Sequence, residues 1–431
     1  MTTSSDGLFT EWCRIGRERD DADPLKSVTD AFFRPRPSLY FDGNSLGPLS
    51  RPARDAVRRT LKQWEELAVS GWSEGNPSWF ERERWLSARL APLVGARPSE
   101  LSLGGSTTQQ LHQLLATFYR PTGRRTVVLV DMGAFPTDRY AAESHVSWHG
   151  LDPASSLRTI GPDDAGFLDP DAICQAFTDD VAVALLPSVV YTTGERLPMR
   201  QITEAARDAG VFLIWDLCHS AGLVPHRLHD DGVEAAVFCT YKYLNGGPGS
   251  PAAVFVHDRH HPVTPGLWGW WGSDPAVQFQ MAPEFVPAAD ASGLQLGTPS
   301  MLAMAPLEGS LDLFEQVGIE AVFRRSQELT AFLLEAFHAL VEPYGMTLAT
   351  PEHPERRGGH VGLRHPEALA ISRALKQDGV TPDFRMPDII RLCPAPFLTR
   401  SLDIVRALWR LRVILREERY RTHLTDDSPV W

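Results

Sequence analysis

The sequence predicts an α/β protein in which a mostly parallel β-sheet is flanked by helices and a smaller α+β domain follows at the C-terminal end. Between about residues 85 and 260, short apolar runs rich in β-branched residues alternate with helical patterns. Strands separated by helices form parallel sheets that are covered on both faces. The chain has 431 residues, 43% of them apolar, which is more than one hydrophobic core usually holds, so we expect two domains.

Each predicted strand is a short apolar run, and the predicted helices lie between these runs. The strands are expected at residues 125–131, 181–187, 211–216 and 235–241, and the helices at 107–119, 171–177 and 199–210. The first helix carries the i, i+3, i+4, i+7 stripe of an amphipathic helix at Leu111, Leu114, Leu115 and Phe118. Ligands of such sheets bind beyond the carboxyl ends of the strands.

The pattern changes after residue 300. One long helical stretch covers residues 301–345, and the segments 360–365, 368–379 and 389–396 then suggest a small α+β domain. We therefore place the boundary near residue 310, with a large domain at residues 51–310 and a small domain at 311–431. The first 50 residues do not fit the sheet, and we expect residues 1–50 to pack with the small domain or with a second subunit.

Charge and composition exclude several classes of protein. Lys and Arg total 42 and Asp and Glu total 54, giving a net charge of −12, and no basic block suited to nucleic acid occurs. The N-terminus lacks the pattern of a signal peptide, and no apolar run approaches the length of a membrane span, so we expect a cytoplasmic protein with no membrane partner. The five cysteines are widely spaced and form no C-x-x-C pair, which argues against a disulfide framework or a zinc site.

Asp216 and His219 follow one of the apolar runs, in VFLIWDLCHSAG. Both side chains are expected at the carboxyl end of the strand, where a ligand binds. Burying even a neutral polar group costs about 2–7 kcal/mol without partners, so a carboxylate there needs a cation or hydrogen-bond donors. Taken alone, capping of the next helix explains Asp216 about as well as a functional role does.

Lys242 lies at the end of the next run, in CTYKYLNGGPG. The distance along the chain fits one strand, one crossover and one more strand, so Asp216 and Lys242 are expected to face the same crevice. Apolar residues that precede a lysine disfavour its charged form and lower its pKa, which suits the amine to forming a Schiff base. A strand-terminal lysine that simply reaches solvent is the commoner alternative.

The helix start at residues 104–108, GGSTT, adds a third element. Small residues and hydroxyls at a helix N-terminus can bind an anion through free N–H groups and the helix dipole, although plain N-capping is commoner. A carboxylate, a lysine and an anion-binding helix start at one sheet edge are together what pyridoxal 5′-phosphate requires. Phe135, which follows another strand, is placed to cover the ring of this cofactor.

Two histidine clusters are weaker candidates. They are HDRHH, with His257, His260 and His261, and HPERRGGH, with His353 and His360. Both lie in stretches rich in proline or charge and lack the helical i, i+4 spacing, so we interpret them as solvated loops and expect no metal site.

Other motifs are missing or ambiguous. The P-loop, G-x-S-x-G and strand-linked G-x-G-x-x-G motifs are absent, which argues against nucleotide binding and a hydrolase triad. Trp268, Trp270 and Trp271 are expected to pack in the core, with a flat ligand or a subunit interface as the alternative.

Several stretches resemble the kynureninases, which are pyridoxal phosphate enzymes of fold type I. They include YFDGNSLGPLS, STTQQLH, FPTDRYAAES, WDLCHSAGLVPHRLHDDGVEAAVFCTYKYLNGGPGSPA, LGTPS and IIRLCPAPF. The matches follow the family's order from about residue 40 to 410, and the longest is highly specific. The resemblance implies a fold-type I, transferase-like architecture and a homodimer whose active sites are shared between the subunits.

The resemblance also implies a role for individual residues. Lys242 is expected to be the Schiff-base lysine, Asp216 the partner of the pyridine nitrogen, and Tyr241 a phosphate ligand and proton donor. The other expected cofactor contacts are Thr107, Thr108, Phe135, Pro136, Thr137, Asp138 and His219, with Trp270 and Thr298 from the second subunit. Arg391 would hold the substrate α-carboxylate by a bidentate fork, and Ser45 and Trp72 would line the aryl end.

The implied reaction is hydrolysis of L-kynurenine to anthranilate and L-alanine, in tryptophan catabolism or a biosynthetic branch. Trp72 and Thr298 resemble the bacterial members, which favour kynurenine over its 3-hydroxy form. One loop departs from the family, because Ser188, Val190 and Thr192 replace its usual histidine, asparagine and lysine. A related lyase or hydrolase of a substituted kynurenine or another β-acyl amino acid therefore stays an alternative, as do another reaction on the same cofactor and a catalytically silent scaffold.

Overall fold

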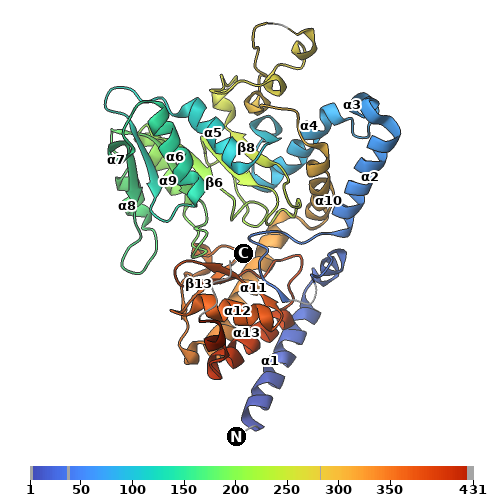
Figure 1. The fold of residues 1–431 in the computed structure, drawn as a ribbon, viewed down its shortest axis with the longest axis vertical. Helices are drawn as coiled ribbons and strands as arrows, with labels where there is room; N and C mark the ends of the chain where they lie inside the picture. Colours follow the sequence, from blue (N-terminus) through green and yellow to red (C-terminus); the bar gives the residue numbers. More distant parts are fainter. Residues whose placement is uncertain (1–2, 36–38, 282, 425–431) are drawn as a thin grey trace.

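A seven-stranded sheet forms the centre of the large domain in the computed structural model, which describes residues 3–35, 39–281 and 283–424 (Figure 1). The strand order is β2-β8-β7-β6-β5-β3-β4. β8 is antiparallel to β2 and β7, and the other neighbours pair in parallel. The strands are β2 (Leu101–Gly104), β3 (Val127–Asp131), β4 (Leu157–Ile160), β5 (Val181–Pro187), β6 (Phe212–Asp216), β7 (Ala235–Cys239) and β8 (Ala252–Val256). The predicted α/β class with a mostly parallel sheet is confirmed.

The central strands β3, β5, β6, β7 and β8 are almost wholly apolar because helices cover both faces of the sheet there. Alternate residues of β3 point to opposite faces: Val128 and Val130 join one hydrophobic core, and Leu129 joins the other. The first core is covered by α5 (Thr107–Phe118) and α6 (Pro136–Trp148). The second is covered by α4 (Trp79–Leu90), α8 (Pro170–Gln175), α9 (Met199–Asp208) and α10 (Met301–Val317).

The small domain is built on a four-stranded antiparallel sheet in the order β12-β13-β10-β9. Its strands are β9 (Thr347–Leu348), β10 (Val361–Arg364), β12 (Asp383–Arg385) and β13 (Ile389–Leu392). The sheet shares a core with α11 (Ile319–Leu340), α12 (Ala368–Gln377) and α13 (Ser401–Arg416). This domain lies below the large one in Figure 1.

The N-terminal segment lies on the small domain. Helix α1 (Thr3–Ala22) packs against α13 and contributes Trp12 and Cys13 to the core of that domain. Farther along, β1 (Leu39–Tyr40) pairs in parallel with β11 (Val380–Thr381). The chain then enters the large domain at α2 (Arg51–Leu67).

The long helical stretch after residue 300 is two helices, because it breaks at Gly318. This glycine has φ +81°, a backbone conformation that side chains disfavour. Helix α10 lies against α2 so closely that a Cβ on Gly309 would come within 2.2 Å of the Pro52 carbonyl carbon. The chain therefore passes from the large core to the small one close to Gly318.

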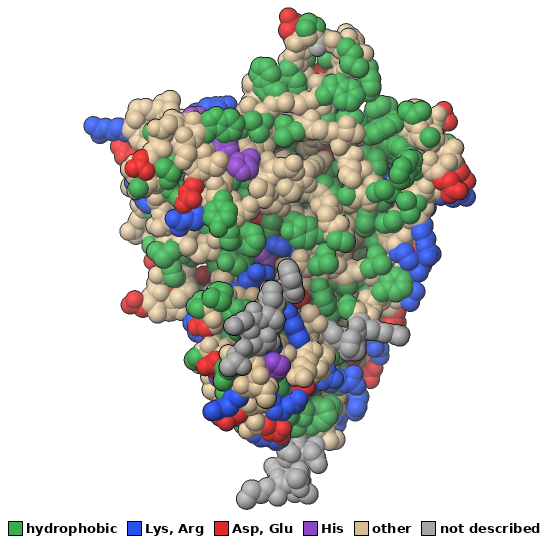
Figure 2. Space-filling model, viewed as in Figure 1, with side chains coloured by type: hydrophobic (Ala, Val, Ile, Leu, Met, Phe, Trp, Pro, Cys, Tyr) green, Lys and Arg blue, Asp and Glu red, His purple; other side chains and the backbone are tan. Residues whose placement is uncertain are grey.

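Aromatic side chains gather on the surface of the large domain, near α3 (Gly71–Glu74) and η6 (Trp270–Gly272). Ring centroids lie 5.5 Å apart for Trp72 and Trp271 and 5.2 Å apart for Phe80 and Phe279. Hydrophobic side chains cover much of this part of the face in Figure 2. Large exposed apolar patches mark interaction sites. We call this set the aromatic patch: Trp72, Phe80, Trp270, Trp271 and Phe279.

Within the described part of the chain, none of the helices combines the length and apolar character needed to cross a membrane.

Candidate active site

A cavity of about 290 Å³ lies at the carboxyl ends of the central strands, where the small domain meets the large one. The strand ends contribute Asp131, Pro187 and Asp216, and the small domain contributes Arg385 and Arg391. This is the edge of a parallel sheet at which ligands bind. Its volume is close to the lower end of the range for small-molecule pockets. We refer to it as the central pocket.

Lys242 enters the central pocket from the turn that follows β7. Its Nζ lies 3.0 Å from Nε2 of His219, a buried histidine whose Nδ1 has no hydrogen-bond partner. Burial, together with the charges of Lys242 and Arg391, holds the pKa of His219 well below its usual range. His219 is therefore a neutral imidazole at neutral pH and accepts a hydrogen bond from the lysine.

Three carboxyl groups lie close to the lysine at the same sheet edge. Asp216 ends β6 and accepts a hydrogen bond from the Cys218 N–H at 2.7 Å. Burial is the main cause that raises the pKa of Asp131 to about 7, and the charge of Asp216 contributes to this increase. Burial also raises the pKa of Asp138 well above its usual range, with the charges of Asp216 and Asp131 acting in the same direction.

These carboxyl groups fit a protonated pyridine nitrogen. Oδ1 of Asp138 and Oδ2 of Asp131 are buried without hydrogen-bond partners. Buried polar atoms are rarely left unpaired, and a cationic N–H donor would relieve both the desolvation and the mutual repulsion. The chemistry of the site therefore suits the ring of pyridoxal phosphate at this end of the pocket.

Two helix starts supply an anion site beside the lysine. Ser106 caps α5, because its Oγ accepts from the Gln109 N–H at 3.3 Å while the Gln109 side chain accepts from the Ser106 N–H at 2.7 Å. Capping by Ser106 leaves Thr107 and Thr108 to face the pocket. Thr108 Oγ1 lies 2.7 Å from Oγ1 of Thr137 at the start of α6. The capping alternative and the anion-binding hypothesis are thus compatible, because different residues serve them.

Arg391 is held rigidly in the part of the pocket wall that the small domain supplies. It is almost fully buried, its Nε and Nη2 donate to the Asp383 carboxylate, and Nη1 donates to the Tyr191 carbonyl at 2.6 Å. Nη2 lies 3.5 Å from Ser45 Oγ. Because Asp383 occupies the Nε edge of the guanidinium, the edge between Nη1 and Nη2 is the one available to a substrate carboxylate.

Sequence analysis missed several polar residues of this site, among them Asp131, Asp383 and Arg385. Asp383 and Arg385 come from β12, where Asp383 is the register partner of Arg391, and Arg385 Nε donates to Asp383 at 3.0 Å. Asp131 ends the predicted strand 125–131, as Asp216 ends 211–216. This shared position at a strand end was the signal that could have identified Asp131.

The structure does not bring every predicted residue to the central pocket. Phe135, Asp138 and Tyr241 line it, and Pro136 forms the first turn of α6 just behind them. Trp72 and Trp270 lie in the aromatic patch, and Thr298 is exposed outside the pocket lining. For Trp270 and Thr298, the contact expected from a second subunit stays a prediction.

The histidine clusters do not form simple solvated loops. His257 is 7% exposed and His360 is fully buried, so the interpretation of these two as loop residues in solvent is wrong. They are buried because each packs against residues far away in the sequence. His360 lies beside Tyr243, with its ring 5.6 Å from that of His219, and His257 lies beside Glu100 and His229.

In the altered loop, Ser188 pairs with a residue outside the pocket lining, whereas the wall of the pocket is formed by Val189, Val190 and Tyr191. Ser188 Oγ lies 2.6 Å from Ser220 Oγ, while Val189 and Val190 line the central pocket. The loop therefore offers a substrate ring an apolar surface.

The fold is that of known pyridoxal phosphate enzymes. The solved structure of the cystine C–S lyase C-DES, a mutant with glycine linked covalently to its cofactor, superposes with a TM-score of 0.76 at 18% identity, over 88% of this chain and 97% of that one. A cysteine desulfurase from Thermococcus onnurineus superposes with a TM-score of 0.77 at 15% identity, over 91% of this chain and 98% of that one. Together with the central pocket, the fold defines a fold-type I pyridoxal phosphate-dependent enzyme.

Sequence relatives define the family. The kynureninase of Geobacillus thermodenitrificans is 41% identical over 407 residues, 94% of this chain and 95% of that protein. The kynureninase of Shouchella clausii is 38% identical over 416 residues, 96% of this chain and 97% of that protein. Residues 322–411 match the family model for the kynureninase C-terminal domain. The chain belongs to the kynureninase family.

Proposed function

We propose that this enzyme hydrolyses L-kynurenine to anthranilate and L-alanine with pyridoxal phosphate as cofactor. The observation that carries the proposal is that one cavity is lined by Lys242 and three buried carboxyl groups from the large domain and by Arg391 from the small domain. An amino-acid substrate needs both, a reacting centre and an anchor for its α-carboxylate.

The cofactor would be held by groups that the fold already orients. Lys242 would carry it covalently, Asp216 and Asp138 would face its ring nitrogen, and Thr107 and Thr108 would bind its phosphate. Phe135 would cover one face of the ring. When bound, pyridoxal phosphate stores the electrons released at the substrate α-carbon.

Two side chains of this site are suited to moving protons. The Lys242 amine, once displaced by substrate, can remove the α-proton, and neutral His219 at 3.0 Å can accept a hydrogen bond from the resulting ammonium. Burial raises the pKa of the Tyr241 hydroxyl, so it stays protonated at neutral pH. When water adds to the γ-carbonyl carbon and the bond to the β-carbon breaks, the oxygen of the water stays in the carboxylate of anthranilate, and Tyr241 can donate a proton to the β-carbon that remains with alanine. Arg391 meanwhile fixes the α-carboxylate and with it the orientation of the bond to be cleaved.

Incubation of the purified protein with L-kynurenine tests this function. We expect fluorescent anthranilate and L-alanine in equal amounts. Transamination or another reaction on the same cofactor would leave the carbon–carbon bond intact and produce no anthranilate, which would refute the proposed reaction. Protein that binds no pyridoxal phosphate would instead indicate a catalytically silent scaffold.

A second candidate is a related hydrolase or lyase of a substituted kynurenine, because the loop that contains Ser188, Val190 and Thr192 departs from that of the family. Because Val189 and Val190 offer no hydrogen bond to a ring hydroxyl, we expect kcat/KM for kynurenine to exceed that for 3-hydroxykynurenine by about 10- to 100-fold. Measuring kcat/KM on both substrates checks this prediction. A clear preference for the hydroxylated or another substituted kynurenine would favour the second candidate.

We further propose that two copies of the chain share their active sites, with Trp270 and Thr298 reaching the partner's pocket. Trp270 is 43% exposed in the aromatic patch, and Thr298 is exposed on the same chain outside its own pocket. Covering this patch would bury rings that otherwise contact water.

Mixing two inactive variants tests the shared site. Lys242→Ala and Trp270→Ala proteins, unfolded and refolded together or co-expressed, should regain activity, because a mixed dimer has one site that carries neither change. When equal amounts of the two variants pair at random, about half of the dimers are mixed, and one of the two sites in each mixed dimer is intact, so about a quarter of all sites are intact. Each variant co-expressed only with itself is the control. No recovery above those controls would contradict the sharing of Trp270.

A further inference from the structure

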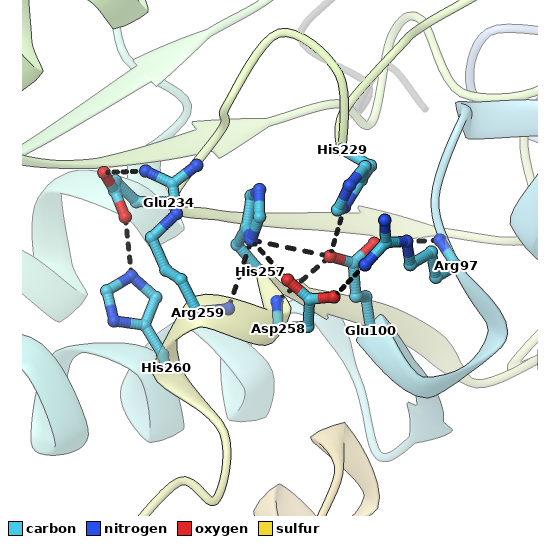
Figure 3. Close-up of polar contacts among 8 residues, drawn as sticks. All are labelled: Arg97, Glu100, His229, Glu234, His257, Asp258, Arg259 and His260. Atoms are coloured by element: carbon cyan, nitrogen blue, oxygen red, sulfur yellow. Dashed lines mark hydrogen bonds and ion pairs between the residues drawn. The ribbon is translucent and has the colours of Figure 1, made fainter.

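Four potential metal ligands meet at the end of the sheet remote from the central pocket. Glu100 directly precedes β2, and His257 and Asp258 directly follow β8, which is its antiparallel neighbour. His229 comes from the loop between β6 and β7. Figure 3 shows the three partner side chains pointing towards the Glu100 carboxylate. We call these four residues the Glu100 cluster.

The spacing of the ligand atoms fits a single small cation. His229 Nδ1 lies 2.7 Å from Glu100 Oε1, and His257 Nδ1 lies 3.6 Å from that oxygen and 3.0 Å from Asp258 Oδ1. All four atoms lie within 4.8 Å of one another. Around a tetrahedral Zn²⁺ with bonds of about 2.1 Å, neighbouring ligand atoms lie about 3.4 Å apart. Small side-chain adjustments would therefore close the four atoms around the ion.

The Nδ1 atom of His257 lies close to a donor and to an acceptor. The Arg259 N–H is 3.2 Å away and the Asp258 carboxylate oxygen is 3.0 Å away. The lone pairs of a nitrogen and a carboxylate oxygen at that distance repel unless a proton or a cation lies between them. A metal ion would take the lone pair that now receives the long bond from Arg259.

The outer oxygens of both carboxylates are already fixed, which orients the inner ones. Glu100, fully buried, accepts the Arg97 N–H on Oε2 at 2.8 Å, and the Arg97 guanidinium pairs with Asp258 Oδ2. Oε1 of Glu100 and Oδ1 of Asp258 are thus directed at the histidines. A hydrogen bond to the outer oxygen of a carboxylate fixes the direction of its other oxygen, and such oriented ligands raise the affinity of a metal site.

We propose that the Glu100 cluster binds one Zn²⁺ ion per chain through His229, His257, Glu100 and Asp258. Imidazole and carboxylate ligands without a thiolate suit zinc and neighbouring divalent transition metals. The ion would join the chain before β2, the chain after β8 and the loop that carries His229. Glu100 precedes β2, whereas Ser106, which lines the central pocket, follows the same strand. The cluster and the pocket therefore lie at opposite ends of β2, and the role of the metal would be structural and independent of the reaction.

Calorimetric titration of the cofactor-bound, full-length protein with zinc chloride, after treatment with a chelator and dialysis, tests this site. We expect one Zn²⁺ per chain by calorimetry and elemental analysis, and a higher melting temperature with zinc than without it. Turnover of L-kynurenine should change less than twofold when the metal is removed. A failure of the metal site would leave the proposed reaction untouched, because the two are measured separately.

Variants assign the bound metal to the cluster. His229→Gln and Asp258→Asn change side chains that are 20% and 30% exposed, so both variants should fold, and each should weaken zinc binding at least tenfold. His260→Gln is the matched control, because His260 also pairs with a carboxylate, Glu234, at 2.5 Å but has no second histidine ligand. Absence of zinc binding, or equal binding by wild type and both cluster variants, would overturn the proposal.

Discussion

Lys242→Ala is expected to lower kcat/KM for L-kynurenine by about 10⁴-fold or more and to abolish the visible absorbance of the purified protein. Removing a residue that forms the covalent link and also moves the proton typically has effects of this size. The loss should lie in kcat, because Arg391 and the apolar wall of the central pocket remain to bind substrate. Steady-state kinetics and an absorbance spectrum of the dialysed protein check both parts.

The fold should survive this substitution. Lys242 Nζ contacts His219 at 3.0 Å, so the variant loses one hydrogen bond at the edge of a cavity and leaves the apolar core unchanged. Lys62→Ala is the matched control, since Lys62 lies on α2 in an exposed ion pair with Glu66. Retained absorbance and turnover in Lys242→Ala would show that another residue carries the cofactor.

Arg391→Ala is expected to lower kcat/KM for L-kynurenine by about 10²- to 10³-fold, mainly by raising KM. Hydrogen bonds to charged groups contribute about 1.5–3 kcal/mol each, and the free edge of this guanidinium can make two of them to the substrate carboxylate. Cofactor content should be unchanged, because the contacts of Arg391 are Asp383, Tyr191 and Ser45, which are not among the residues proposed to hold the cofactor. Kinetics together with the absorbance spectrum separate substrate binding from cofactor binding.

Stability complicates this second substitution and must be measured with it. Arg391→Ala leaves the buried Asp383 with Arg385 as its remaining cation, so the melting temperature should fall as well. Arg391→Lys keeps a cation beside Asp383 but loses the planar fork, so it should recover stability better than KM. Arg364→Ala, on the neighbouring strand β10 with its own partner Asp388, is the control. Unchanged kinetics in Arg391→Ala would refute the assignment of the carboxylate anchor.

The elements that sequence analysis predicted correctly are those with a strong local pattern. The runs at 181–187 and 211–216 are buried on both faces and therefore read as uninterrupted apolar stretches. β2, β4 and β8 were not predicted. β2 and β4 have four residues each, so their sequences carry little strand signal and pairing within the sheet determines them. β8 (AAVFV) has the same apolar pattern as the predicted β7 (AAVFC), so its sequence did carry a signal for a strand.

For the central pocket, sequence analysis identified residues at strand ends and missed residues that depend on register. Asp216 and Lys242 each end an apolar run, and the structure brings both to the pocket. Asp383 meets Arg391 because β12 and β13 pair in one particular register, which no local pattern specifies. The Glu100 cluster was missed for the same reason, since its four members come from three separate segments of the chain.

The aromatic patch links assembly to chemistry in the proposed dimer. A chain without its partner would expose Trp270 and Phe279 to water and would lack two side chains of its pocket. Association follows mass action, so dilution would shift the population towards such chains. Specific activity would then depend on the total enzyme concentration, and the same dilution that lowers turnover per chain would also favour aggregation through the uncovered rings.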